Sequence, residues 1–273
     1  MLIINADDLG FTDGVTRGIG EAYRAGTLTS ASLMVNTAGF VGALDLIRDS
    51  EGLGVGLHIN LTVGRPVAPL ARVQSLIDQR TLRFRSLAQV AARAFMATLS
   101  ASEVRIEVEA QFARACDAGV SLTHVDGHQH VHLLPGIAPI VREVAHRFGV
   151  PFIRQPVESL THRPWRIRAT LVKGALKLAH RRSGGSAIAP VSQLRGISLQ
   201  GGGAFGDRLH ADLLRLPEGV TEMIVHPGHV DRELEAIDDY LLPREIELRA
   251  LTHPDLAPFL RSLPLRLANF ATR

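Results

Sequence analysis

Short apolar segments alternate with segments of helical spacing along this chain, and this alternation constrains the fold more than any other feature. The strand-like segments are residues 2–5, 29–35, 53–61, 122–126, 151–154, 221–225 and 265–268. The helical segments between them include residues 14–25, 39–48, 87–99, 102–118, 135–148, 209–216 and 243–251. About seven strands that alternate with helices predict an α/β fold built on a parallel sheet.

Acidic and imidazole side chains lie where several of these predicted strands end: Asp7, Asp8, His58, Asp126, His128 and His226. In parallel α/β folds, catalytic and binding residues collect at the carboxyl ends of the strands. We therefore expect these side chains to lie at one edge of the sheet. Any one of them alone would more often be a surface or hydrogen-bonded residue, so the interpretation depends on their occurring together.

These residue types are typical of a catalytic metal site. Such a site usually has about three protein ligands and one position left for water. One aspartate and two histidines meet that count. The adjacent pair Asp7 and Asp8 suits a division of labour, in which one carboxylate binds the ion and the other takes a proton from water. The sequence therefore predicts metal-assisted hydrolysis.

The segment from residue 124 to residue 132 contains more histidines than one metal ion needs. On an extended chain, His124, Asp126 and His128 share one face. We expect Gly127 to interrupt that regularity, so that only one or two of these side chains bind the ion. The remaining ones, His124, Asp126 and His130 among them, would orient the ligands or contact the substrate.

The bulk composition limits the class of protein. With 273 residues and 46% hydrophobic content, we expect one catalytic domain over residues 1–273, with a less regular basic insertion around residues 160–205. The formal charge of +3 is too weak to indicate nucleic-acid binding. No apolar run reaches the roughly 18 residues that a membrane span needs, and the first residues lack the features of a signal peptide. The one cysteine, Cys116, excludes a disulfide framework, so the expected location is the cytoplasm. We expect this cysteine to be buried.

Three weaker features each have two interpretations. The basic segment 162–182 is either a surface for a lipid-linked or acidic substrate, or an amphipathic helix packed on the fold. Trp165, the one tryptophan, is either a platform for a sugar ring or a packing residue. Arg154 either binds a substrate hydroxyl, orients Asp7 or Asp8, or forms a surface ion pair.

The chain resembles the YdjC-like carbohydrate deacetylases, which include chitooligosaccharide deacetylases and hopanoid-associated deacetylases. The matching motifs are Asn-Ala-Asp-Asp-Leu-Gly-Phe at 5–11, Gly-Val-Gly-Leu-His-Ile-Asn-Leu-Thr at 54–62, Thr-His-Val-Asp-Gly-His-Gln-His-Val-His at 123–132, Glu-Met-Ile-Val-His-Pro-Gly-His at 222–229 and Arg-Glu-Ile-Glu-Leu at 244–248. The resemblance implies a distorted parallel (β/α) barrel similar to the NodB-type polysaccharide deacetylases. It also implies removal of acetyl from an N-acetylated amino sugar, either chitooligosaccharide-like or lipid-linked.

The resemblance also implies roles for individual residues. By position, Asp8, His58 and His128 are the metal ligands, Asp7 is the general base and His226 is the general acid. The ion would be one Mg²⁺ or Zn²⁺, and two imidazoles with one carboxylate suit Zn²⁺ better. Gly127 and Gln129 stand where family members often have other residues, which leaves the exact sugar open.

Other functions remain as alternatives at this point. A metal-dependent hydrolase of a phosphoester or of another acyl amide could use the same barrel, and a non-catalytic sugar-binding protein could keep the fold. The expected partner is a small carbohydrate. Peripheral contact with a membrane and assembly into a homodimer are both left open.

Overall fold

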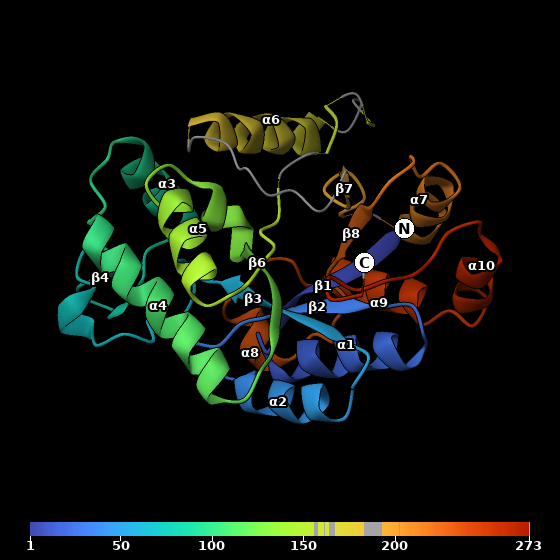
Figure 1. The fold of residues 1–273 in the computed structure, drawn as a ribbon, viewed down its shortest axis with the longest axis horizontal. Helices are drawn as coiled ribbons and strands as arrows, with labels where there is room; N and C mark the ends of the chain where they lie inside the picture. Colours follow the sequence, from blue (N-terminus) through green and yellow to red (C-terminus); the bar gives the residue numbers. More distant parts are fainter. Residues whose placement is uncertain (156–157, 161, 164–166, 183–192, 202, 273) are drawn as a thin grey trace.

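A curled parallel sheet forms the centre of the computed structural model, which describes residues 1–155, 158–160, 162–163, 167–182, 193–201 and 203–272. Among these residues, six strands pair in the order β6-β3-β2-β1-β8-β7, and every pairing in this sheet is parallel. Helices surround the sheet (Figure 1). The predicted α/β fold, a distorted parallel (β/α) barrel, is confirmed, but its sheet has six strands in the described residues where about seven were expected.

The strand β1 (Leu2–Leu9) lies at the middle of this sheet and is buried along its whole length. Its neighbours are β2 (Ser30–Leu33) and β8 (Thr221–Val225). Strand β3 (Gly54–Ile59) follows β2, β6 (Leu122–Gly127) lies at one edge, and β7 (Gln193–Arg195) lies at the other. Strands covered on both faces carry continuous apolar runs, which is why these segments are readable in the sequence.

Helices connect the strands much as the apolar spacing predicts. The helices that match expected segments are α1 (Asp13–Arg24), α2 (Phe40–Arg48), α3 (Leu87–Phe95), α4 (Ala101–Asp117), α5 (Ala138–Arg147), α6 (Ile167–Arg182), α7 (Phe205–Leu213) and α9 (Leu242–Leu251). Two further helices, α8 (Arg232–Glu235) and α10 (Leu256–Ser262), were not expected. Residues 63–85 contain a 3-10 turn η1 (Leu70–Arg72) and a small hairpin of β4 (Ile77–Asp78) and β5 (Arg83–Phe84).

Local chemistry explains where α1 begins and how closely it packs. Its N-cap is Thr12, whose side chain accepts a hydrogen bond from the Val15 N–H. A Cβ at Gly18 would lie 2.7 Å from the Cα of Gly228. Glycine at residue 18 therefore lets α1 contact the backbone that follows β8.

Several expected elements differ from the structure. Residues 151–154 and 265–268 were expected to be strands. In the described chain each segment forms one isolated bridge, Val125–Ile153 and Leu2–Leu267. Strand β7 was not expected at all. Cys116 lies in α4 as expected, but on its exposed side, so the prediction that it is buried was wrong.

Helix α6 lies across the top of the molecule in the view of Figure 1, away from α1 and α2. Its Lys173 is buried and donates hydrogen bonds to the carbonyl of Ser159 and to the Ser198 hydroxyl. These bonds attach the helix to the segments before and after it. Leu171 on the same helix is exposed. Trp165 lies outside the described residues. Within the part of the chain that is described, no helix has the length and apolar character to cross a membrane.

Candidate active site

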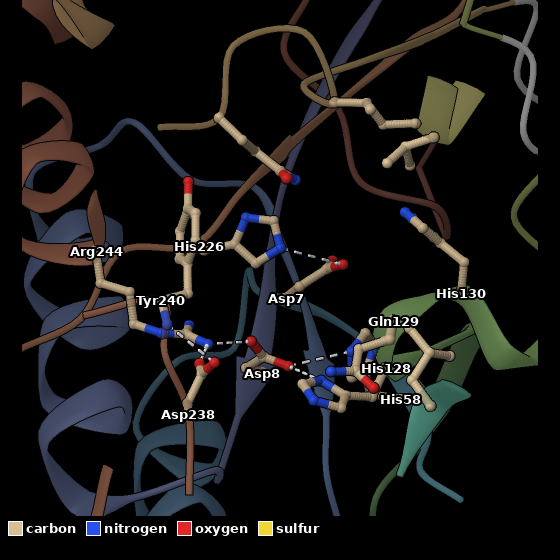
Figure 2. A pocket seen from close by; sticks show the side chains of 15 residues that line it. Asp7, Asp8, His58, His128, Gln129, His130, His226, Asp238, Tyr240 and Arg244 are labelled. Atoms are coloured by element: carbon tan, nitrogen blue, oxygen red, sulfur yellow. Dashed lines mark hydrogen bonds and ion pairs between the residues drawn. The ribbon is translucent and has the colours of Figure 1, made fainter. Parts of the chain in front are cut away.

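Asp7 and Asp8 line the same cavity although they are neighbours on one strand (Figure 2). In a regular strand, successive side chains point to opposite faces. Here the pairing of β1 with β2 shifts register between Ala6 and Leu9, and Asp8 adopts a φ of 70°. This irregularity at the carboxyl end of β1 turns both carboxylates into a cavity of about 250 Å³, as predicted from their position.

Asp8, His58 and His128 form a compact group of possible metal ligands in this cavity. One candidate ligand atom from each residue lies within 4.8 Å of the other two. Oδ1 of Asp8 is 2.8 Å from Nδ1 of His128 and 3.2 Å from Nε2 of His58. The other nitrogen of His58, Nδ1, donates to Oδ1 of Asp126 at 2.8 Å, an outer contact typical of metal-binding histidines.

A second group, made of Asp7, His58 and Asp126, has similar spacing, but a cation already occupies it. Arg154 donates to both oxygens of Asp7, each at 2.7 Å. Its Nη2 also lies 2.7 Å from Oδ2 of Asp126. Because the guanidinium fills this space, the group that fits a metal ion, of the two found among the described residues, is Asp8, His58 and His128.

The charge of the buried cluster also favours a cation. Burial lowers the pKa of His58, but the carboxylates of Asp126, Asp8 and Asp7 together outweigh burial and raise that pKa to about 10. Burial raises the pKa of Glu222 to about 7, although Arg154 opposes this. The carboxylates around the cavity thus hold a proton on a buried imidazole, and a divalent ion would replace that proton.

Arg154 positions Asp7, which decides between the interpretations considered for this arginine. It is 2% exposed and also donates from Nε to Glu222 at 2.7 Å, so the surface ion pair is excluded. Oδ1 of Asp7 accepts a further hydrogen bond from Asn5 at 2.9 Å, whereas Oδ2 accepts only from Arg154 in the described chain. Burial raises the pKa of Asp7, but Arg154 and His58 together outweigh it and hold that pKa below its ordinary value. Asp7 is therefore ionised, and Oδ2 keeps one free acceptor direction.

His226 faces that free oxygen. Its Nε2 lies 3.9 Å from Oδ2 of Asp7. The backbone N–H of His226 donates to Glu247 at 2.6 Å, and the hydroxyl of Tyr240 donates to the other oxygen of Glu247 at 2.6 Å. The rings of His226 and Tyr240 meet edge to face, with centroids 5.6 Å apart. Nδ1 of His226 is buried and has no hydrogen-bond partner among the described residues.

The remaining histidines of the 124–132 segment separate into different places. His124 lies behind the site, where its Nε2 is 3.1 Å from the hydroxyl of Ser32 and its ring stacks on Phe270. His130 lines the cavity, and burial together with Arg154 lowers its pKa to about 3, so its ring is neutral. The break in the extended chain comes after Gly127, at Gln129 and His130, which have φ of 52° and 58°.

The site contains residues to which sequence reasoning gave no role: Glu222, Asp238, Tyr240, Arg244 and Glu247. Arg244 and Glu247 belong to α9 and are buried. An arginine and a glutamate three residues apart on a helix are usually a solvated ion pair. The sequence predicts a helix over residues 243–251 and a family motif at 244–248, but neither observation gives Arg244 or Glu247 a role in the site.

Comparison with known proteins identifies the relatives of this chain. A family model described as YdjC-like protein matches residues 1–262. The chain is 30% identical over 270 residues to a carbohydrate deacetylase of Thermoanaerobacter pseudethanolicus, covering 99% of this chain and 98% of the relative. It is 30% identical over 280 residues to a chitooligosaccharide deacetylase of Yersinia enterocolitica, with the same coverage.

One solved structure has a similar fold over nearly the whole chain. It is a crystal structure from Enterococcus faecalis V583, provisionally described as a cellobiose-phosphate cleavage protein. The two chains superpose with a TM-score of 0.76 at 26% identity, covering 99% of this chain and 97% of the other. The match of the family model over nearly the whole chain confirms the resemblance seen in the motifs, and this chain belongs to the YdjC-like protein family.

Proposed function

We propose that this protein is a metal-dependent carbohydrate N-deacetylase, which hydrolyses the acetyl amide of an amino sugar and releases acetate. The observation that carries the proposal is one cavity that contains the group Asp8, His58 and His128 together with Oδ2 of Asp7 and Nε2 of His226. The names of the relatives supply the bond that is cleaved. We also propose that residues 1–273 act as one catalytic unit.

Asp8, His58 and His128 would hold the divalent ion. When bound, such an ion polarises the acyl oxygen and lowers the pKa of water. Two imidazoles and one carboxylate favour Zn²⁺ over Mg²⁺, because Mg²⁺ prefers oxygen ligands.

Asp7 would accept the proton of the attacking water at Oδ2, the oxygen that has a free acceptor direction. Arg154 holds this carboxylate by both oxygens, so the base does not rotate during the reaction. His226 would donate a proton from Nε2 to the departing nitrogen as the amide C–N bond breaks. Glu247 fixes the backbone of His226, which keeps the imidazole above Asp7.

The other walls of the cavity suit an amino sugar. Tyr240 offers an aromatic ring, Gln200 and His130 offer polar groups, and Leu87 and Val172 add apolar surface. Sugar sites commonly combine such aromatic and polar groups. The substrate would be a chitooligosaccharide or a glycan carried by a lipid.

Acetate release from N,N′-diacetylchitobiose tests the proposal. Purified protein, first stripped of metal, would be supplied in turn with Zn²⁺, Mg²⁺, Mn²⁺ or Co²⁺. We expect acetate and free amine in equal amounts, only with a metal. A parallel assay with bis(4-nitrophenyl) phosphate tests the phosphoesterase alternative, and hydrolysis of that compound without any acetate release would refute the proposal.

A further inference from the structure

Arg244 joins a candidate metal ligand to the loop between α8 and α9. Its side chain is 1% exposed, and its Nη2 donates to Oδ2 of Asp8 at 2.7 Å and to Oδ2 of Asp238 at 2.6 Å (Figure 2). The guanidinium carbon lies 5.6 Å from the ring centre of Phe11 and 5.7 Å from that of Tyr240. Arginine stays charged at any physiological pH, so this arrangement does not depend on a proton.

The two oxygens of Asp8 therefore have different neighbours. Oδ2 faces Arg244, whereas Oδ1 faces the nitrogens of His128 and His58. Asp7 differs from its neighbour, because Arg154 contacts both of its oxygens. The two aspartates thus differ, because Asp8 presents one oxygen without an arginine contact to the candidate metal group, whereas Arg154 contacts both oxygens of Asp7.

This difference has a consequence for metal binding. A carboxylate can bind an ion through one oxygen or through both. A second oxygen from Asp8 would occupy a coordination position that a catalytic site leaves for water. Arg244 holds Oδ2 away from the group formed by Oδ1, His58 and His128, so the second mode requires breaking a buried ion pair.

The backbone of Arg244 supports the same geometry. Its carbonyl accepts a hydrogen bond from the N–H of Gly228 at 3.3 Å, within the segment that carries His226. Glu247, three residues later on α9, binds the backbone of His226. The first turns of α9 thus hold the end of β8 and the end of β1 in a fixed relation.

We propose that Arg244 is a positioning residue that makes Asp8 a one-oxygen ligand and keeps a coordination position open for water. The inference rests on the proposed metal site and deepens it. Loss of such an outer partner typically lowers metal affinity by about 10–100-fold.

The test uses Arg244→Gln, with Zn²⁺ affinity measured by competition with a chromophoric chelator and with the visible spectrum of the Co²⁺-loaded protein. We expect a 10–100-fold weaker Zn²⁺ affinity and a weaker Co²⁺ absorption, since Asp8 would then supply both oxygens and raise the coordination number. Arg249→Gln is the matched control: it makes the same change at an exposed arginine of α9 and should keep the wild-type affinity and spectrum. Arg244→Lys keeps one cationic donor for Asp8 and should recover the wild-type spectrum.

Three outcomes would overturn the inference. They are a wild-type affinity and spectrum for Arg244→Gln, an Arg249→Gln variant as impaired as Arg244→Gln, and an Arg244→Lys variant with an altered spectrum. If Arg244→Gln does not fold, as judged by thermal unfolding without metal, Arg244→Lys decides. Wild-type protein that binds neither Zn²⁺ nor Co²⁺ refutes the proposed function, and this inference with it. Wild-type protein that binds them without releasing acetate refutes only the proposed deacetylase reaction.

Discussion

Replacing Asp7 by asparagine should separate catalysis from metal binding. The substitution keeps the shape of the side chain but replaces one carboxylate oxygen by an amide nitrogen, and the remaining oxygen is a poor proton acceptor. Arg154 binds both positions, so it will hold the amide oxygen at one of them. The atom at the Oδ2 position, 3.9 Å from Nε2 of His226, can then no longer act as the general base.

The expected loss follows from this geometry. A positioned general base contributes about 10²–10⁴-fold to the rate. At about 1.4 kcal/mol for each factor of ten, the barrier rises by about 3–5 kcal/mol. The loss of the charged partner of Arg154 costs about 1.5–3 kcal/mol of unfolding free energy. Arg154 keeps Asp126 and Glu222, so the protein should still fold.

Two measurements on the same variant check this reasoning. Acetate release should fall by two to four orders of magnitude, while Zn²⁺ affinity should stay within about threefold, because Asp7 does not belong to the group that fits the ion. An Asp7→Asn variant with more than a tenth of the wild-type rate would refute the role of Oδ2. A variant that has lost its metal would show that Asp7 is a ligand.

Three further predictions concern the surroundings of the site. Asp126→Asn leaves a single acceptor oxygen for both His58 and the nearby arginine, and should weaken Zn²⁺ binding by about 10–100-fold in chelator competition. Burial lowers the pKa of His124 in the folded protein to about 4, whereas a histidine in the unfolded chain has a pKa of about 6.5. The unfolded state therefore binds a proton first as the pH falls, and stability is lost between about pH 6.5 and pH 4. Between pH 7 and pH 5, the unfolding free energy measured in urea should fall by about 2 kcal/mol more for the wild type than for His124→Gln. Gly18→Ala places a Cβ 2.7 Å from backbone and should lose about 1–3 kcal/mol, whereas Gly174→Ala, with no atom within 4 Å, should gain about 0.5–1 kcal/mol in thermal unfolding.

Each of these predictions has a contrary result. An Asp126→Asn affinity within twofold of wild type would show that the orientation of His58 does not depend on this contact. His253→Gln, at an exposed histidine, is the control for the pH experiment, and equal acid sensitivity in both histidine variants would contradict the assignment to His124. Equal effects of the two glycine substitutions would show that α1 can move away from the segment after β8.

The residues of the candidate site were predictable where chemistry and strand ends coincide. Asp7, Asp8, His58 and His128 each follow an apolar run, so parallel pairing brings them together without any further information. Arg154 was open to several interpretations because a lone arginine after a strand has no pattern of its own. Burial and its contact with Asp7 settle that question.

Other parts of the site depend on contacts that the local pattern does not contain. Arg244 and Asp8 are 236 residues apart, and nothing in the spacing around Arg244 indicates that its helix face is buried. Strand β7 is only three residues long, so its pairing with β8 has no periodic signal in the sequence. Cys116 illustrates the opposite error, because a helical pattern does not by itself say which side faces the core.

Titration of metal-stripped protein with Zn²⁺, while acetate release from N,N′-diacetylchitobiose is followed, tests the central claim most directly. The proposed site holds one ion, so the rate should rise in proportion to added Zn²⁺ and level off at one ion per chain. His58→Ala should show no such rise at the same concentrations. Full activity of the stripped protein, or the same titration curve for His58→Ala, would contradict a metal-dependent reaction at Asp8, His58 and His128.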